Sequence, residues 1–354
     1  MSSKNNNKMD DFYGNHVHHD IITHYDDNFS KYYNRITAEL KLLNINLNTL
    51  QGARVIDVGT GMQSLVFEKL NCKEVFHFDI SSVQIESFNE YLKTNNIKNI
   101  LSLQADILDP LFSFPKYDFA FIYGVLHHLP NPSILISNLL SSADKNSKIM
   151  FRCYRSGTWS RWLVHKIRDL NHLISIEKLR NTFGIVFPLE DNKQFINDMI
   201  DDVFVSQWGA FHPAQFRKDA EMLNLSYYSP DNEFDLDFNH YDENFRVVFG
   251  ANEHSTSIIN SKDLKISSPI NQGALHSEIY NMSQLNHVWD SYVNKISSLS
   301  EMEVCIRVIS LYRLTRKMNS NDYYYSKYNT SSFTHSSEIG ESRIKNFMKI
   351  LSQT

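Results

Sequence analysis

The pattern of hydrophobic and polar positions between residues 53 and 154 alternates between two kinds of segment. Short apolar runs of the kind found in buried strands occupy 55–58, 74–81, 100–104, 117–124 and 147–154. Between them, apolar residues recur at helical spacing over 64–71, 82–94 and 132–143. Strands that alternate with helices in this way predict an α/β fold built on a parallel sheet.

The same sheet is completed later in the chain. A helix is predicted over 213–223, followed by strands over 225–229 and 245–251. The polar stretch 230–244 joins these two strands as a long loop, so they form an antiparallel hairpin at the end of the sheet. The core domain therefore spans residues 51–252.

Segments outside this pattern define the rest of the predicted organisation. Residues 1–24 are predicted as a disordered tail, and residues 25–50 as an amphipathic helix that caps the sheet. Residues 155–212 form a helical insertion, which we interpret as a lid over the carboxyl edge of the sheet; a structural or dimerising insert is the alternative. Residues 253–354 form a helical extension through which a homodimer can assemble.

The first strand ends in a glycine turn, Val55 to Ser64, with the sequence VIDVGTGMQS. Glycines allow positive φ and let a ligand lie against bare backbone, and the following helix start offers unpaired N–H groups. A dinucleotide site has a third glycine and faces a pyrophosphate, which the acid at Asp57 would repel. S-adenosylmethionine has a sulfonium, an ammonium and no phosphate, so Asp57 favours this cofactor over NAD; a plain structural turn is the alternative.

Two further acids follow the next strands. Asp79 ends the second strand, where a carboxylate can accept hydrogen bonds from ribose hydroxyls, and Asp106 follows the third. Taken singly, each reads as a strand-end or N-cap residue. Taken together with Asp57, they predict a nucleoside site at one edge of the sheet.

These motifs, VIDVGTG, FHFDIS, QADILD and YDFAFIYGVLHHLPNP, resemble the cofactor half of class I S-adenosylmethionine-dependent methyltransferases. The resemblance covers residues 53–150 and implies a Rossmann-like seven-stranded sheet, mostly parallel with an antiparallel last strand, and methyl transfer by direct displacement. It further implies a set of cofactor-binding residues: Asp57, Gly59 and Gly61 at the methionine end, Asp79 with Ile80 at the ribose, Asp106 with Ile107 at the adenine, and Tyr123 with Gly124 at the sulfonium. Gln63, which stands where the family often has a third glycine, belongs to the same predicted cofactor-binding set.

Three histidines are candidates for chemistry at the acceptor. His127 and His128 follow the fourth strand, and His212 precedes the helix at 213. If the acceptor has a high pKa, a general base is needed, and we assign His127 first and His212 second to this role. His128 is assigned to substrate binding, and a purely structural histidine is the alternative at either position of the pair.

The stretch from Lys148 to Arg168 contains six basic residues, no acidic residue and two tryptophans. Arginine binds carboxylate or phosphate with a forked geometry, so Arg152, Arg155 and Trp159 are predicted to bind an anionic acceptor. The alternatives are a solvated helix face and an RNA-binding surface with tryptophan platforms.

Composition narrows the class of protein. A hydrophobic content of 42% excludes a disordered chain, and a net charge of −5 gives no general reason to expect DNA or RNA. The three cysteines form neither a metal motif nor a disulfide framework. The histidine cluster at 16–24 lacks a metal-binding spacing, and no signal or membrane-spanning segment is apparent, so we expect a cytoplasmic protein without a metal or a membrane partner.

The sequence therefore predicts a methyltransferase that uses S-adenosyl-L-methionine, yields S-adenosyl-L-homocysteine, and methylates an O or N of a small, acid-bearing metabolite or natural-product intermediate. The alternatives are an RNA or protein methyltransferase and an inactive methyltransferase-like binding module.

Overall fold

The computed structural model describes residues 10, 12–17, 25–109, 111–156, 158–186, 193–206, 208–230, 244–251, 282–315, 347, 349 and 351. These residues divide into two compact units. The first unit contains everything from the N-terminal turn to Tyr154, and it takes in a further helix and two strands after Ser206. The second unit combines residues 155–205 with the helices near the C-terminus.

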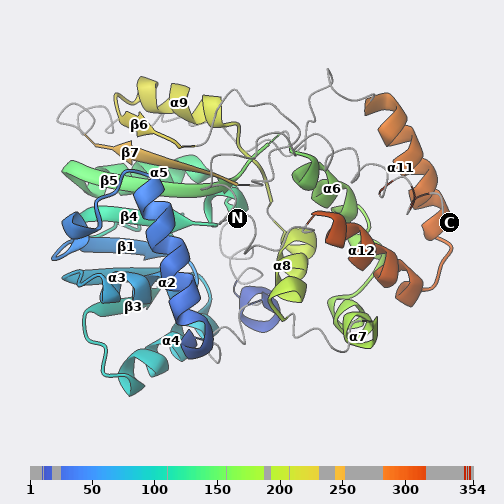
Figure 1. Cartoon of the computed structure of the whole chain (residues 1–354), viewed down its shortest axis with the longest axis horizontal. Coiled ribbons are helices and arrows are strands. Elements are labelled where there is room, and N and C mark those ends of the chain that lie inside the picture. Colours follow the sequence, from blue (N-terminus) through green and yellow to red (C-terminus); the bar gives the residue numbers. More distant parts are fainter. Residues whose placement is uncertain are drawn as a thin grey trace, which may run out of the picture. The chain divides into compact units, whose positions relative to one another are not determined.

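The first unit is built on a seven-stranded sheet of order β3-β2-β1-β4-β5-β7-β6. Its strands are β1 (Arg54–Val58), β2 (Glu74–Asp79), β3 (Ile100–Gln104), β4 (Tyr117–Tyr123), β5 (Ala143–Tyr154), β6 (Ser226–Tyr228) and β7 (Asn244–Gly250). The pairs among β1 to β5 are parallel, and β7 is antiparallel to both β5 and β6. The predicted Rossmann-like sheet with a reversed last strand is confirmed (Figure 1).

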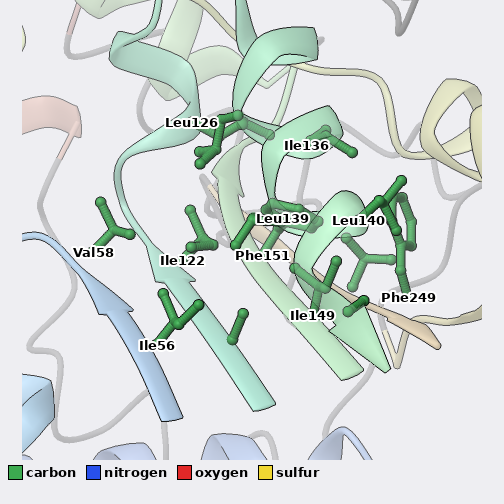
Figure 2. Close-up of a cluster of buried hydrophobic side chains, with 14 of the residues drawn as sticks. Ile56, Val58, Ile122, Leu126, Ile136, Leu139, Leu140, Ile149, Phe151 and Phe249 are labelled. Atoms are coloured by element: carbon green, nitrogen blue, oxygen red, sulfur yellow. The ribbon is translucent and has the colours of Figure 1, made fainter. Parts of the chain in front are cut away.

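Helices cover both faces of this sheet. On one face, α2 (Tyr25–Leu42), α3 (Met62–Lys69) and α4 (Ser82–Thr94) pack against alternate strand residues such as Val55, Val75 and Phe121. On the other face, α5 (Pro132–Ser142) and α9 (Pro213–Met222) pack against the intervening strand residues, which include Ile56 and Ile122. Figure 2 shows this second cluster, with Leu139 of α5 lying over Phe151 of β5. The alternation follows because successive strand side chains point to opposite faces.

Two short helical turns complete this part of the first unit, η3 (Leu47–Leu50) before β1 and η4 (Leu126–His128) after β4. The strand β5 starts at Ala143, four positions before the predicted start at 147, because Ala143 pairs with Tyr117 before the register shifts at a bulge. The polar loop predicted at 230–244 lies almost wholly outside the described residues.

The N-terminal segment differs from its prediction. Residues 13–17, expected within a disordered tail, form a π-helical turn, η1 (Tyr13–Val17). The nearby Asp10 carboxylate accepts a hydrogen bond from the Ser82 backbone N–H at 2.9 Å and so caps the start of α4. Composition could not reveal this contact, because it joins positions 72 residues apart. His18, His19 and His24 lie outside the described residues.

The second unit is helical. It contains α6 (Trp159–Arg168), the turn η5 (Asn171–Leu173), α7 (Ile176–Val186), α8 (Lys193–Phe204), α11 (Met282–Ile296) and α12 (Glu301–Thr315). Buried Arg161 of α6 and Asp202 of α8 form an ion pair at 2.9 Å, and the Tyr312 hydroxyl of α12 donates to the same carboxylate at 2.6 Å. The segments predicted as a lid and as a separate C-terminal extension therefore share one core. The regions 252–281 and 316–346, which include most of the proposed dimerising extension, lie outside the described residues.

Candidate cofactor site

The turn between β1 and α3 has the backbone that its glycines permit. Gly59 has φ of 131° and Gly61, the residue before α3, has φ of 82°. A Cβ atom on Gly61 would lie 2.8 Å from the Phe88 ring of α4, which is closer than real Cβ contacts. Glycine is therefore required at 61 by conformation and by space, and the turn lies tightly against α4. Gln63, in the first turn of α3, accepts a hydrogen bond from the Thr60 hydroxyl at 3.3 Å.

Asp57 lies one residue from the end of β1 and is fully buried. Its Oδ2 accepts a hydrogen bond from the Ser64 hydroxyl at 2.6 Å, and its Oδ1 has no hydrogen-bond partner. Burial raises the pKa of this carboxyl to about 7, and the Ser64 hydroxyl opposes that rise. A buried carboxylate oxygen without a partner fits a cationic donor, such as the ammonium of a bound amino acid group.

Asp79 ends β2 beside Asp57. Its Oδ1 accepts a hydrogen bond from the Ser81 backbone N–H at 2.7 Å. Burial raises the pKa of Asp79 to about 7, and the nearby carboxylates of Asp57 and Asp10 add to the rise. The two acids predicted from successive strand ends are thus brought together at one edge of the sheet.

Asp106 follows β3 at the same edge, since the next residue toward β3, Ala105, donates its N–H to the Asp79 carbonyl at 2.9 Å. The Asp106 carboxylate accepts from the Leu108 N–H at 3.0 Å, and Ile107 is buried in the hydrophobic core. Ile80 lies between Asp79 and the N-cap Ser81, and its carbonyl accepts from Gln104 at 3.0 Å. The ribose and adenine roles of these residues stay predictions.

Tyr123 closes β4 within a cluster of charged side chains. Its hydroxyl donates to the buried carboxylate of Glu39 at 3.1 Å, and the Arg152 guanidinium lies 4.6 Å from the ring centroid. Arg246 of β7, also buried, faces Glu39 at 3.6 Å. Next in the chain, Gly124 has φ of 78° and donates its N–H to the Arg152 carbonyl at 3.1 Å.

The histidines proposed as bases have structural partners. His127 is 1% exposed, and its Nδ1 accepts a hydrogen bond from the Tyr154 backbone N–H at 3.2 Å. His212 is the N-cap of α9, where its Nδ1 accepts from the Ala214 N–H at 3.3 Å. A neutral imidazole has one basic nitrogen, and in both residues it is engaged by backbone. These contacts give both histidines a structural role, and their assignment as general bases stays a prediction.

The other residues predicted to bind the substrate lie in different parts of the structure. His128 is buried and lies edge-on to the Tyr13 ring at 6.3 Å. Arg155 is buried in the second unit, and the side chain of Trp159 lies outside the described residues. Arg168, from the same basic stretch, donates to the backbone carbonyls of Asp202 and Val205 at 2.6 and 2.7 Å. Part of the basic stretch therefore holds the second unit together.

Three buried residues at this edge were not predicted from the sequence. His77 of β2 and Gln84 of α4 contact the glycine turn, and Glu39 of α2 holds Tyr123. Glu39 lies on the apolar face of its helix, between Ile36 and Leu40, which was a signal of a buried acid. Among the described residues, no group of three or more His, Cys, Asp or Glu side chains could hold a metal ion, and no helix is long and apolar enough to cross a membrane.

Comparison with known proteins agrees with this geometry. Residues 50–201 match a family model described as a methyltransferase domain. This part of the chain is therefore similar to a methyltransferase domain, and such a domain takes S-adenosylmethionine as its cofactor. No curated protein matches the sequence.

Solved structures with similar folds are remote. They include the [4+2]-cyclase SpnF (18% identity, 29% of this chain and 39% of that chain, TM-score 0.27) and an S-adenosylmethionine-dependent methyltransferase from Mesorhizobium loti (15%, 32% and 50%, 0.28). A third is magnesium protoporphyrin IX methyltransferase from Synechocystis PCC 6803 with bound S-adenosylhomocysteine (17%, 62% and 82%, 0.38). The chain spans half or less of the first two, and at these identities and TM-scores the likenesses do not bear on its substrate.

Proposed function

We propose that the whole chain is an active methyltransferase that transfers a methyl group to an oxygen or nitrogen of a small acceptor bearing an acid group. S-adenosylmethionine supplies a methyl group already activated by its sulfonium. The chain's own residues then have to bind and orient the acceptor and exclude water.

The proposal of an acid-bearing acceptor is supported mainly by a row of side chains across three strands. Tyr123 of β4 pairs with Arg152 of β5, which pairs with Arg246 of β7. Residues in register on neighbouring strands point to the same face, and Arg35 of α2 lies over the same face, 5.9 Å from the Tyr123 ring centroid. Arginine side chains from three elements therefore gather beside the predicted sulfonium position, where they favour a carboxylate or phosphate.

The backbone hydrogen bonds at His127 and His212 are compatible with the same proposal. An acceptor whose nucleophilic atom is already ionised at neutral pH needs no general base, since there is no proton to remove. A cytoplasmic location is part of the proposal, and it is supported by three buried cysteines that are all free thiols.

Methyl transfer from labelled S-adenosylmethionine tests this proposal with a panel of small carboxylic acids and phosphates, each beside its neutral amide or ester. We expect turnover only of acids, and an increase in KM of at least about tenfold in R152Q, because a charged contact is lost. R217Q is the matched control, because Arg217 also lies over a tyrosine ring, that of Tyr227 at 5.5 Å, but on α9. Turnover of neutral acceptors alone, or tight salt-dependent binding of RNA, would contradict the acid-bearing small acceptor.

A further inference from the structure

Two carbonyl groups of the glycine turn are held by side chains that no cofactor contact explains. The Gly59 carbonyl accepts a hydrogen bond from Nε2 of His77 on β2. The next carbonyl, that of Thr60, accepts from the Gln84 side chain of α4 at 2.7 Å. Both side chains are buried, His77 fully and Gln84 almost so.

The hydrogen bonds of His77 fix its tautomer. A carbonyl oxygen only accepts, so Nε2 must carry the proton that bonds to Gly59. In a neutral ring Nδ1 then accepts, and the Ser102 hydroxyl of β3 lies 2.8 Å from it. Burial lowers the pKa of His77 to about 4, which keeps the ring neutral near pH 7. His77 therefore stays a donor to the turn over the ordinary pH range.

Holding a carbonyl also sets the direction of the following N–H. The peptide group is planar, and in the trans form its C=O and N–H point in opposite directions. With the Gly59 carbonyl turned to β2, the Thr60 N–H points away from β2; with the Thr60 carbonyl turned to α4, the Gly61 N–H points away from α4. The Phe88 ring packs against Gly61 from the same helix and limits any rotation of the turn.

We propose that His77 and Gln84 are positioning residues for the cofactor, acting through the glycine turn. By pinning two carbonyl oxygens inside the protein, they keep these electron-rich atoms away from an anionic group and orient the Thr60 and Gly61 N–H groups outward. The ligand that benefits is the carboxylate of the methionine part of the cofactor, so this inference rests on the proposed function.

The test is calorimetric titration of the full chain with S-adenosylhomocysteine, with urea unfolding of each variant measured in parallel. H77L and Q84M remove the donors, and we expect each to weaken binding at least about tenfold, because the turn loses a hydrogen bond that defines its shape. H77Q restores an amide donor and should bind within about threefold of the wild type. N99L is the matched control: the Asn99 amide donates to the Cys72 carbonyl at 3.1 Å, away from the turn.

The outcomes separate the two proposals. A loss of affinity in H77L and Q84M, with rescue in H77Q and none lost in N99L at a comparable loss of stability, supports the positioning role. Unchanged affinity in H77L and Q84M overturns it while leaving the proposed function intact, as does an equal loss in N99L. No binding by the wild type overturns the proposed function, and the positioning role with it.

Discussion

The Asp57 carboxylate lies close enough to Asp79 to raise the pKa of Asp79, although the two residues belong to different strands. Both carboxyls are buried, and the pKa of each is raised to about 7. Two like charges at one sheet edge destabilise the protein without a ligand. The same two charges favour the binding of a cationic ligand group. This relationship links the stability of the domain to its cofactor affinity.

Cofactor affinity should therefore depend on pH. Both carboxyls are partly protonated near pH 7, and a ligand that bears an ammonium binds best to the ionised form. We expect the affinity for S-adenosylhomocysteine to rise as the pH increases from about 6 to 8, with protons released on binding. Calorimetry in buffers of different ionisation enthalpy measures that release, which should fall in D57N. Affinity that decreases over this range would contradict the role of Asp57.

The stability of the unliganded protein should show the opposite trend. A folded-state pKa raised from 3.8 to about 7 gives a stability contribution that is complete below pH 3.8 and lost as the pH rises through 7. We expect D57N to unfold at a higher urea concentration than the wild type at pH 8. The free energy of unfolding should be greater by up to about 4 kcal/mol. Measurement at pH 8 avoids His77, whose lowered pKa removes stability only as the pH falls from 6.5 toward 4. A destabilised D57N at this pH would show that the carboxylate is favourably held without ligand.

The ion pair of Glu39 with Arg246 should be important for stability. Both side chains are buried, and removing one partner leaves a buried charge without its counterpart carboxylate. E39L should therefore lower the free energy of unfolding by about 3–5 kcal/mol. Y123F removes one hydrogen bond to Glu39 and should cost about 1–2 kcal/mol. Y228F is the control, because the Tyr228 hydroxyl bonds to the Leu42 carbonyl at an exposed site.

In the second unit, Asp202 joins three helices through Arg161 and Tyr312. D202N should lower the free energy of unfolding by about 3–5 kcal/mol, because Arg161 keeps its charge and loses its ionic partner. The comparison is E301Q, which affects the exposed bond between Glu301 and Ser175 and should have almost no effect. If D202N lowers the thermal stability as little as E301Q does, the buried pair adds no net stability.

Most of the fold could be predicted from the sequence, because strand and helix periods are local signals. Asp57 and Asp79 could be placed at one edge by the general property that parallel strands end together. The partners of His127 and His212 could not be predicted, since both accept from backbone N–H groups that only the folded loops bring near. His77 was missed because a histidine in a strand reads as an ordinary core residue until Gly59 and Ser102 are seen beside it. The shared core of residues 155–205 and α12 depends on tertiary packing that no local pattern encodes.

The central claim is that the sheet edge carrying Asp57 and Asp79 binds S-adenosylmethionine. Calorimetric titration of the wild type and D79N with this cofactor tests it most directly, because Asn keeps the shape of the side chain and removes its charge. We predict saturable binding by the wild type and an affinity at least about tenfold weaker in D79N. No binding by the wild type, or binding that D79N leaves unchanged, would contradict the claim.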